Sequence, residues 1–254
     1  MKTVYWSTIN STRTQDGVYF PNTRVPDSQI PGFDICPLAY REPEVLKASL
    51  PEAIQGMNYL KCPAFTEASR NTYALRLPLD YNISIDIPNG KASSDNHDQA
   101  FFNYLLSLRE LDRGIVQIAI PYMFLCKDSL DMSTFHPYLH SNNITKSGSL
   151  LGGQFDIGKW ARPTNLALML HGDTTELNLV KDDVYSYVKF HTNEKVVLKR
   201  FDYSQAVDLL VNDCLVLKHL VKGVVPLKSC YEAYLKYNYH KKIIKEVRKN
   251  LSEG

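Results

Sequence analysis

The stretch NTYALRLPLDYNISIDI, residues 71–87, decides the fold class, because hydrophobic side chains occupy every second position from Tyr73 to Ile87. Alternation with a period of two places one set of side chains on the buried face of a strand and the other toward solvent. In a helix the same positions would spiral around every side. The stretch therefore predicts one strand, or two strands joined by a bend at Pro78. Four of its side chains are expected to be buried: Leu75, Leu77, Ile83 and Ile85.

Residues 149–201 carry further strand signals, which we interpret as an antiparallel sheet. Turn-forming residues separate the runs, and strands at roughly ten-residue spacing are typical of sandwiches and barrels. Upstream, GIVQIAIPYMFLC, residues 114–126, predicts a buried strand interrupted at Pro121. The four runs of the expected sheet are Leu166–Leu170, Glu176–Val180, Val184–Phe190 and Lys195–Phe201.

Helical spacing of hydrophobic residues occurs in three segments. Phe101–Leu111 predicts a helix that stops at Gly114. A second helix is expected from Ser204, a candidate N-cap, to Gly223, and a third from about Ser229 to Leu251. The combined pattern predicts an α+β fold that is mainly antiparallel β, in a sandwich, jelly-roll or β-clip-like arrangement, with C-terminal α-helices.

The 254 residues are sufficient to bury a large core. Six prolines punctuate residues 1–60, and because proline removes a backbone donor we expect an extended arm there, with one short helix near Pro43–Leu50. Such an arm is ordered only where it wraps its own domain or another subunit. We therefore divide the chain into a Pro-rich N-terminal arm (1–60), a β-rich core domain (61–203) and a C-terminal helical segment packed on the core (204–254).

Composition says little about the partner. Sixteen Tyr, ten Phe and two Trp favour pleated strands and aromatic contact surfaces. The net charge of +2 does not by itself indicate an acidic partner, but residues 228–254 hold seven basic and three acidic side chains, a net of +4. No run approaches ~18 uninterrupted hydrophobic residues, so no membrane association is expected.

The five cysteines have no CxxC spacing, which favours reduced thiols and a cytosolic origin. We therefore expect no structural zinc, no disulfide and no bound cofactor.

Two segments resemble a group of uncharacterised proteins encoded by tailed bacteriophages. One is KCPAFTEASRNTYALRLPLDYNISI, residues 61–85, and the other begins with GGQFDIGKWARPTN at Gly152 and continues to Thr192. The shared features are a Cys-Pro-Ala-Phe segment, an Asn-Thr-aromatic strand start and a Trp-x-Arg-Pro segment before a terminal sheet. This resemblance implies a viral origin and a β-rich core, and it implies no activity.

The second segment is also similar to dUTPase-like β-clip proteins. In those proteins an acidic residue after a glycine activates water, and an aromatic residue stacks on the sugar. Gly153 and Asp156 match this pattern, whereas Lys159 stands where the aromatic residue belongs and Trp160 follows one position later. The Pro-Arg-Ser-Gly loop and the Gly-rich C-terminal arm of that family are absent from the sequence.

The candidate binding residues are Asp156, Trp160, Arg162 and His171. Arg162 beside Trp160 has the chemistry to bind a carboxylate or phosphate, or to stack on a ring; the structural alternative is that it locks the start of the last sheet. His171, Gly172 and Asp173 form an H-x-D sequence, which with a distant histidine, here His191 or His219, can hold iron on a jelly-roll strand. The alternative, a simple turn, is favoured.

Two other patterns have a functional and a structural interpretation. His136 and His140 are four residues apart, as zinc ligands on a helix would be, but no HExxH glutamate accompanies them, so we favour a loop with surface histidines. The tail segment KYNYHKKIIKEVRKN would suit nucleic acid or another anionic surface. A helix packed on the core through Ile243, Ile244 and Val247, with a solvated basic face, is favoured.

Because each catalytic pattern has a stronger structural alternative, we predict a phage-encoded binding protein that is not an enzyme. It would act as a virion component, or in the host cytoplasm as an effector docked on a host macromolecule. A protein partner or self-association is expected, and nucleic acid is possible but not favoured. The alternative is a nucleotide- or metal/oxygen-dependent enzyme with a site near Asp156, Trp160 and His171.

Overall fold

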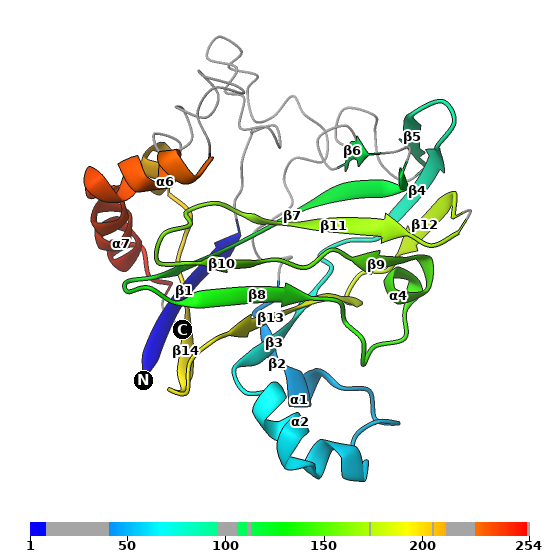
Figure 1. Ribbon diagram of the computed structural model, residues 1–254, viewed down its shortest axis with the longest axis horizontal. Helices are drawn as coiled ribbons and strands as arrows, with labels where there is room; N and C mark the ends of the chain where they lie inside the picture. The colour runs from blue at the N-terminus through cyan, green and yellow to red at the C-terminus, as the bar shows by residue number, and fades with distance from the viewer. Residues whose placement is uncertain are drawn as a thin grey trace.

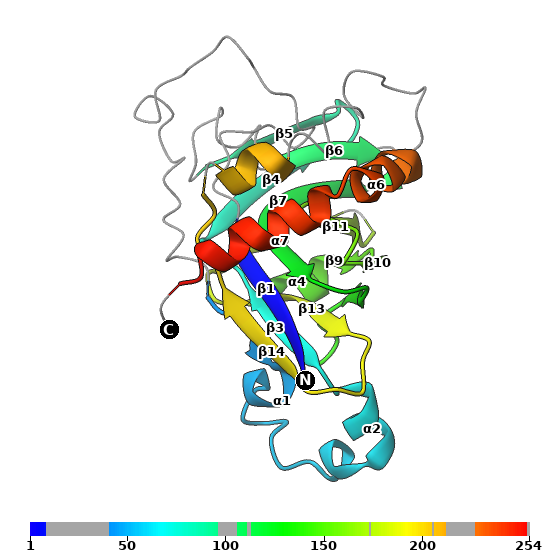
Figure 2. The same cartoon turned by 90° about the vertical axis from the view of Figure 1, so that its left-hand side faces the viewer.

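The computed structural model describes residues 1–8, 41–95, 106–110, 113–172, 174–204, 206–211 and 227–252. Within them the chain forms an α+β fold of mostly antiparallel strands in three sheets, with helices at its edges (Figure 1). Two sheets face each other as a sandwich, and helices cover the outer face of each (Figure 2). The predicted fold class is confirmed in its sandwich form.

The largest sheet lies in the middle of the molecule. Its strands run in the order β14-β1-β7-β11-β9, and β6 also pairs with β7. All neighbours are antiparallel except β1 and β14, which are parallel. The strand bounds are Lys2–Thr8 (β1), Leu106–Glu110 (β6), Ile115–Cys126 (β7), Gly148–Leu150 (β9), Thr164–Leu170 (β11) and Val196–Arg200 (β14).

The second and third sheets are joined by a long, bent two-stranded antiparallel ladder, in which the chain of β3 and β4 runs beside that of β12 and β13. The second has the order β10-β8-β13-β3-β2 and the third β12-β4-β5. Their strands are Glu44–Val45 (β2), Thr72–Arg76 (β3), Tyr81–Asp86 (β4), Lys91–Ser94 (β5), Asp131–Phe135 (β8), Gln154–Asp156 (β10), Glu176–Leu179 (β12) and Val184–Phe190 (β13).

The ladder forms because β3 and β4 pair with β13 and β12 in turn. Between the two sheets the ladder continues at the bend, where Leu77 N donates to Asp183 O (2.9 Å) and Asp182 N donates to Leu77 O (3.0 Å). The expected pair of strands joined near Pro78 is therefore confirmed. The four side chains expected in the core are buried: Leu75, Leu77, Ile83 and Ile85.

The middle sheet is buried on both faces. Along β1, Val4 and Trp6 face the sandwich core, whereas Tyr5 faces the helical layer. Along β7, Phe124 belongs to the first cluster and Met123 and Leu125 to the second. This two-sided burial explains why the sequence of β7 is almost continuously hydrophobic instead of alternating.

The prediction that residues 149–201 form one antiparallel sheet is wrong. All four strands exist, but β11 and β14 lie in the middle sheet, β13 in the second and β12 in the third. Each one pairs with a strand far away in the sequence, and none pairs with another of the four. Periodicity identifies a strand and its buried face, whereas the partner depends on which other faces must be covered.

The predicted helix at Phe101–Leu111 is wrong over Leu106–Glu110, which forms β6 along the first half of β7; residues 101–105 lie outside the described part. β7 itself runs through Pro121 without a break. Opposite that residue the β11 ladder shifts register between Thr164 and Leu166, and this irregularity accommodates a residue that lacks a backbone donor.

Short helices cover the outer face of the second sheet. α1 (Leu46–Ser49) is the short helix expected near Pro43–Leu50, and η3 (Asn58–Lys61) and α2 (Pro63–Ala68) follow it. A further short helix, α4 (Asn143–Ser147), begins with a capping box between Asn142 and Thr145 and contacts β12.

The C-terminal segment packs on the middle sheet. Residues 206–211 are helical, and Ser204 Oγ accepts from Val207 N (3.4 Å), as expected of an N-cap. The single helix predicted over Ser229–Leu251 is two helices, α6 (Leu227–Lys236) and α7 (Tyr239–Lys249). They break at Asn238, whose positive φ of 58° is a conformation that asparagine tolerates.

The boundary at residue 60, predicted from the sequence, does not separate the first strand from the β-rich core. Lys2–Thr8, assigned to the N-terminal arm, is β1 in the middle sheet. Residues 9–40, which hold most of the arm, lie outside the described residues. In the described part of the chain, no helix is long and apolar enough to cross a membrane.

Candidate functional site

Asp156 ends β10 and organises the turn that follows. One carboxylate oxygen accepts from Leu130 N (3.0 Å) and Gly158 N (2.8 Å), and the other accepts from Ser129 Oγ (2.5 Å) and pairs with Lys159 (2.9 Å). Burial raises the pKa of Asp156, but these hydrogen bonds outweigh it and hold the pKa below its usual value. Because all four contacts are made within the protein, this carboxylate stabilises the turn and is not available as a general base.

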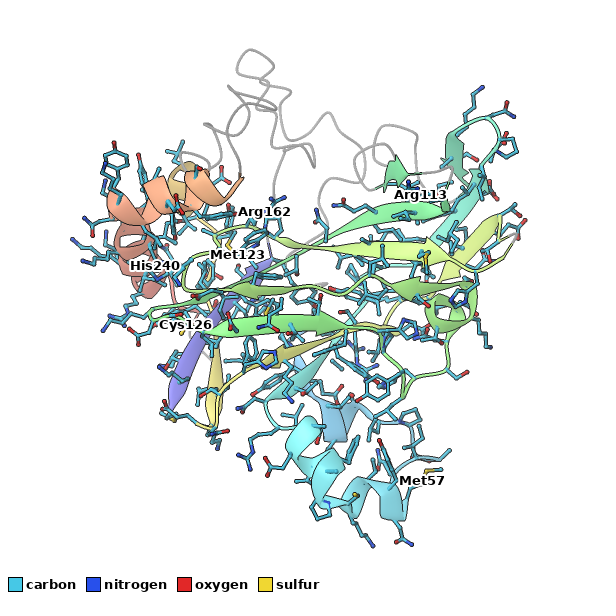
Figure 3. All side chains as sticks on the ribbon, in the orientation of Figure 1. Met57, Arg113, Met123, Cys126, Arg162 and His240 are labelled. Atoms are coloured by element: carbon cyan, nitrogen blue, oxygen red, sulfur yellow. The ribbon has the colours of Figure 1, made fainter. Side chains whose placement is uncertain are left out.

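Trp160 stands in a stack of aromatic rings between the sheets and the helical layer. Its ring centroid lies 4.9 Å from those of Phe155 in β10 and Tyr231 in α6. The Arg162 guanidinium lies 5.1 Å from the Trp160 centroid, in cation–π geometry, close to α6 (Figure 3). These contacts favour the structural interpretation, in which Trp160 fastens α6 to the segment before β11 and Arg162 packs over the Trp160 ring.

His171 forms the turn after β11. Its Nε2 is hydrogen-bonded to Ser149 Oγ (2.7 Å), and its Nδ1 lies 3.3 Å from Lys146 O. Gly172 follows with a positive φ of 54°. This is the turn that the sequence favoured. Asp173 and His219 lie outside the described residues, and exposed His191 contacts Ser133 Oγ (2.6 Å). Within the described ranges no three His, Cys, Asp or Glu side chains come together as a metal site.

The candidate residues therefore form two places, not one. Asp156, Trp160 and Arg162 lie before β11, and His171 lies after it, separated by seven strand residues or about 20 Å. Asp156 and Trp160 share one local structure through Lys159 and Phe155.

His140 is buried, which corrects the prediction of surface histidines, and it ties the loop after β8 to α1. Its Nε2 lies 2.8 Å from Ser49 O and its Nδ1 lies 2.6 Å from Tyr187 Oη. Because a carbonyl only accepts, Nε2 carries the proton, so in the neutral ring Nδ1 accepts from the Tyr187 hydroxyl. Burial lowers the pKa of His140, which favours this neutral form. His136 is half-buried, and its Nδ1 accepts from Leu150 N (3.2 Å).

A second arrangement of the same kind, not foreseen from the sequence, lies at α7. His240 Nε2 donates to Lys127 O (2.9 Å), and Tyr234 Oη lies 3.0 Å from its Nδ1. Figure 3 shows His240 at the inner side of the helical layer, near Cys126. Among the cysteines whose side chains are described, Cys126 is buried and Cys62 is exposed, and both are free thiols.

An exposed aromatic surface, also not foreseen, lies beneath the second sheet. Met57, Tyr59 and Tyr138 are 52, 58 and 59% exposed, and we call them the tyrosine surface. Leu60 and Leu139, which directly follow the two tyrosines, pack against the same hydrophobic cluster. Burial raises the pKa of the Tyr138 phenol, and its interaction with the Tyr59 phenol raises that pKa further. Met57 marks this end of the molecule in Figure 3, away from Arg162 and His240.

Each exposed tyrosine rests on a buried ring. Tyr59 lies 4.9 Å from Phe65, and Tyr138 lies edge-on to Tyr187 at 5.5 Å. Phe65 and Tyr187 are both buried. The tyrosine surface is therefore held in place before any partner arrives.

Comparisons of the chain with protein-family models, curated proteins and solved structures gave no match.

Proposed function

We propose that this protein is a binding protein that docks on a partner protein through the tyrosine surface. The observation that carries the proposal is the pair of exposed tyrosines, Tyr59 and Tyr138, fixed from beneath by Phe65 and Tyr187. Tyrosines and methionine are enriched in protein interfaces, where a rigid ring buries a large area at little cost in conformational entropy.

The fate of the polar candidates supports binding over catalysis. Both carboxylate oxygens of Asp156 are bonded within the turn around it, Trp160 stacks on α6, and Arg162 packs over the Trp160 ring. His171 lies at the far end of β11 from both. A catalytic group must reach the reacting atoms of a substrate, and these side chains are committed to internal contacts instead.

The proposal extends to origin and location. The resemblance of residues 61–85 and 152–192 to tailed-phage proteins supports a phage-encoded product, acting either as a virion component or in the host cytoplasm on a host protein. Mass spectrometry of purified virions separates the two: presence of the chain supports a virion component, and absence supports an effector.

Site-directed photo-crosslinking tests the docking surface. A benzophenone amino acid would replace Tyr59 or Tyr138 and, as a matched control, Tyr237, which is 61% exposed at the α6–α7 break. During infection we expect discrete crosslinks to the same protein from positions 59 and 138 and not from position 237. No crosslink from the first two, or an identical product from all three, would contradict the proposal.

A further inference from the structure

The break at Asn238 changes what the basic residues of α7 require. In one long helix over Ser229–Leu251 they would all lie in its C-terminal half, and none would oppose the positive end of the helix dipole. In the structure only Arg248 and Lys249 occupy the last turn of α7. Lys241 and Lys242 fall in its first turn, which has no acidic residue, and there a positive charge opposes the dipole. The dipole therefore does not account for these two lysines.

Three of the cations form one line along the exposed side of α7. Lys241, Lys245 and Arg248 have the spacing i, i+4, i+7, which places them on one face, and all three are exposed. They flank the buried residues Ile244 and Val247. We call these three residues the cationic stripe.

The cationic stripe has no ion-pair partner within the described residues. Glu246, the single acidic residue of α7, lies outside the line and pairs with Lys249 (2.7 Å). Arg248 is held in place by a neutral group, because its Nε donates to Tyr5 Oη (3.0 Å). That bond uses Nε alone, and because the side chain is exposed the two terminal nitrogens of the guanidinium can bind an anion.

The charge continues onto the sheet beneath. Tyr5 in β1 is in register with Lys199 in β14, and residues paired across a sheet present their side chains on the same face. Lys199 is exposed, so it extends the cationic stripe from Arg248 toward the edge of the middle sheet. Figure 2 shows α7 lying across this part of the sheet.

We propose that the cationic stripe binds the phosphate backbone of a nucleic-acid duplex, a function separate from protein docking at the tyrosine surface. Along α7 the three cations advance by about 6 and then 4.5 Å. Phosphates advance by about 3.4 Å per nucleotide along each strand, so successive cations are one to two nucleotides apart. A line of unpaired cations with this spacing suits a regular polyanion, and no base-reading side chain is required.

Salt dependence of binding to a 20-base-pair DNA duplex tests the proposal on the full chain. Three phosphate contacts predict a slope of about −2.7 for log K against log salt, a loss of about 40-fold in affinity between 50 and 200 mM. Lys241→Gln/Lys245→Gln/Arg248→Gln is expected to abolish the binding. Lys61→Gln/Lys91→Gln/Lys181→Gln removes the same charge from exposed lysines elsewhere, and it should bind as the natural sequence does.

A second variant guards against a folding defect. Lys241→Gln/Lys245→Gln keeps the bond between Arg248 and Tyr5, and its slope should fall to about −0.9. Absence of salt-dependent binding, equal loss in the control variant, or binding to phosphatidylserine vesicles without binding to the duplex would each overturn the proposal.

Discussion

The two outer covers of the sandwich are built from different elements and fastened by the same chemistry. Over the second sheet, α1, η3 and α2 are short and rest on a small cluster around Leu46 and Tyr187. Over the middle sheet, α6 and α7 are longer and rest on a larger cluster that includes Ile243. In both covers a buried tyrosine and a histidine form a relay that ends on a backbone carbonyl.

The carbonyls at the ends of the two relays explain why the arrangement occurs twice. Ser49 is the last residue of α1, so its carbonyl has no partner within the helix. Lys127 follows the last residue of β7, where the ladder has ended. Each carbonyl lies under a cover, where an unpaired backbone group is unfavourable, and a histidine supplies the missing donor.

The difference between the covers lies in where the relay side chains originate. In the first, Tyr187 comes from a strand and His140 from a loop; in the second, Tyr234 and His240 both come from helices. The same hydrogen-bond geometry therefore serves unrelated local structures, and what the two places share is a carbonyl that accepts from a buried histidine.

Truncations beneath the covers should have the largest effects on stability. Leu46→Ala and Ile243→Ala remove fully buried side chains, and each should lower the free energy of unfolding by about 2–5 kcal/mol, as should Leu77→Ala in the shared core. Met169→Ala, on a side chain that is 41% exposed, is the control and should change little. Denaturant titration measures the effects.

Hydrogen exchange on the same variants sharpens the comparison. If a cover opens separately from the sandwich, its truncation will speed exchange in that cover while global unfolding stays unchanged. That outcome for Ile243→Ala alone would show that only the first cover is part of the cooperative core.

Removing the relay hydroxyls should have an intermediate effect. Tyr187→Phe leaves two groups without their hydrogen-bond partner: Leu139 N, which donates to the hydroxyl at 3.2 Å, and His140 Nδ1. We therefore expect the free energy of unfolding to fall by about 1–3 kcal/mol. Tyr234→Phe removes the bond to His240 and should lower stability by about 0.5–1.5 kcal/mol. Tyr138→Phe, whose phenol is exposed, serves as the control. Equal stability of all three variants would mean that the relays contribute nothing.

Much of the fold could be predicted from local patterns, and its connections could not. The alternation at 71–87 gave the two strands and their buried side chains, because a strand shows its buried face every second residue. β6 was missed because its hydrophobic residues also fit a helix and its pairing with β7 decides between the two. The break at Asn238 was missed because asparagine does not force a positive φ.

The candidate site was harder to predict, because function depends on which side chains remain available. Asp156 and His171 were chosen as chemically capable groups, and the structure shows what each one bonds. Tyr59 and Tyr138 are 79 residues apart in the sequence, and only tertiary packing brings the adjacent Leu60 and Leu139 to the same hydrophobic cluster.

Acid should lower the stability through two histidines, His140 beneath the first cover and His136, which accepts from Leu150 N in the middle sheet. Burial lowers the pKa of both His140 and His136 from the ordinary value of 6.5, and for His136 the nearby His171 adds to the effect. The unfolded chain therefore binds protons more readily than the folded chain, so their stabilising contribution is complete above pH 6.5 and is lost as pH falls through the lowered values. Stability should be lower at pH 5.5 than at pH 7.5.

A double variant isolates this contribution. Burial raises the pKa of Asp183, which works in the opposite direction as pH falls, so the natural chain reports a sum. His136→Gln/His140→Gln should flatten the decline between pH 7.5 and 5.5, measured by denaturant titration at both values. A decline of unchanged size would locate the pH dependence elsewhere.

The smallest expected effect is also the one whose sign separates stability from function in the second cover. Lys241 and Lys242 stand in the first turn of α7, where their charge opposes the helix dipole. Replacing Lys241 with Gln should therefore stabilise the protein, by about 0.3–1 kcal/mol at low ionic strength. Lys242 is a less direct test, because its ammonium also lies 4.8 Å from the Tyr239 ring centroid in cation–π geometry. Lys249→Gln should destabilise it, because Lys249 lies in the last turn and also pairs with Glu246. Thermal unfolding at low and high salt measures both changes, which should shrink together as salt screens the charges.

A stabilised Lys241→Gln variant that binds duplex DNA less tightly would show a charge kept at the expense of stability, as expected of a residue that serves a ligand. Destabilisation by Lys241→Gln would instead give that lysine a structural role and remove the main reason for assigning it to the cationic stripe.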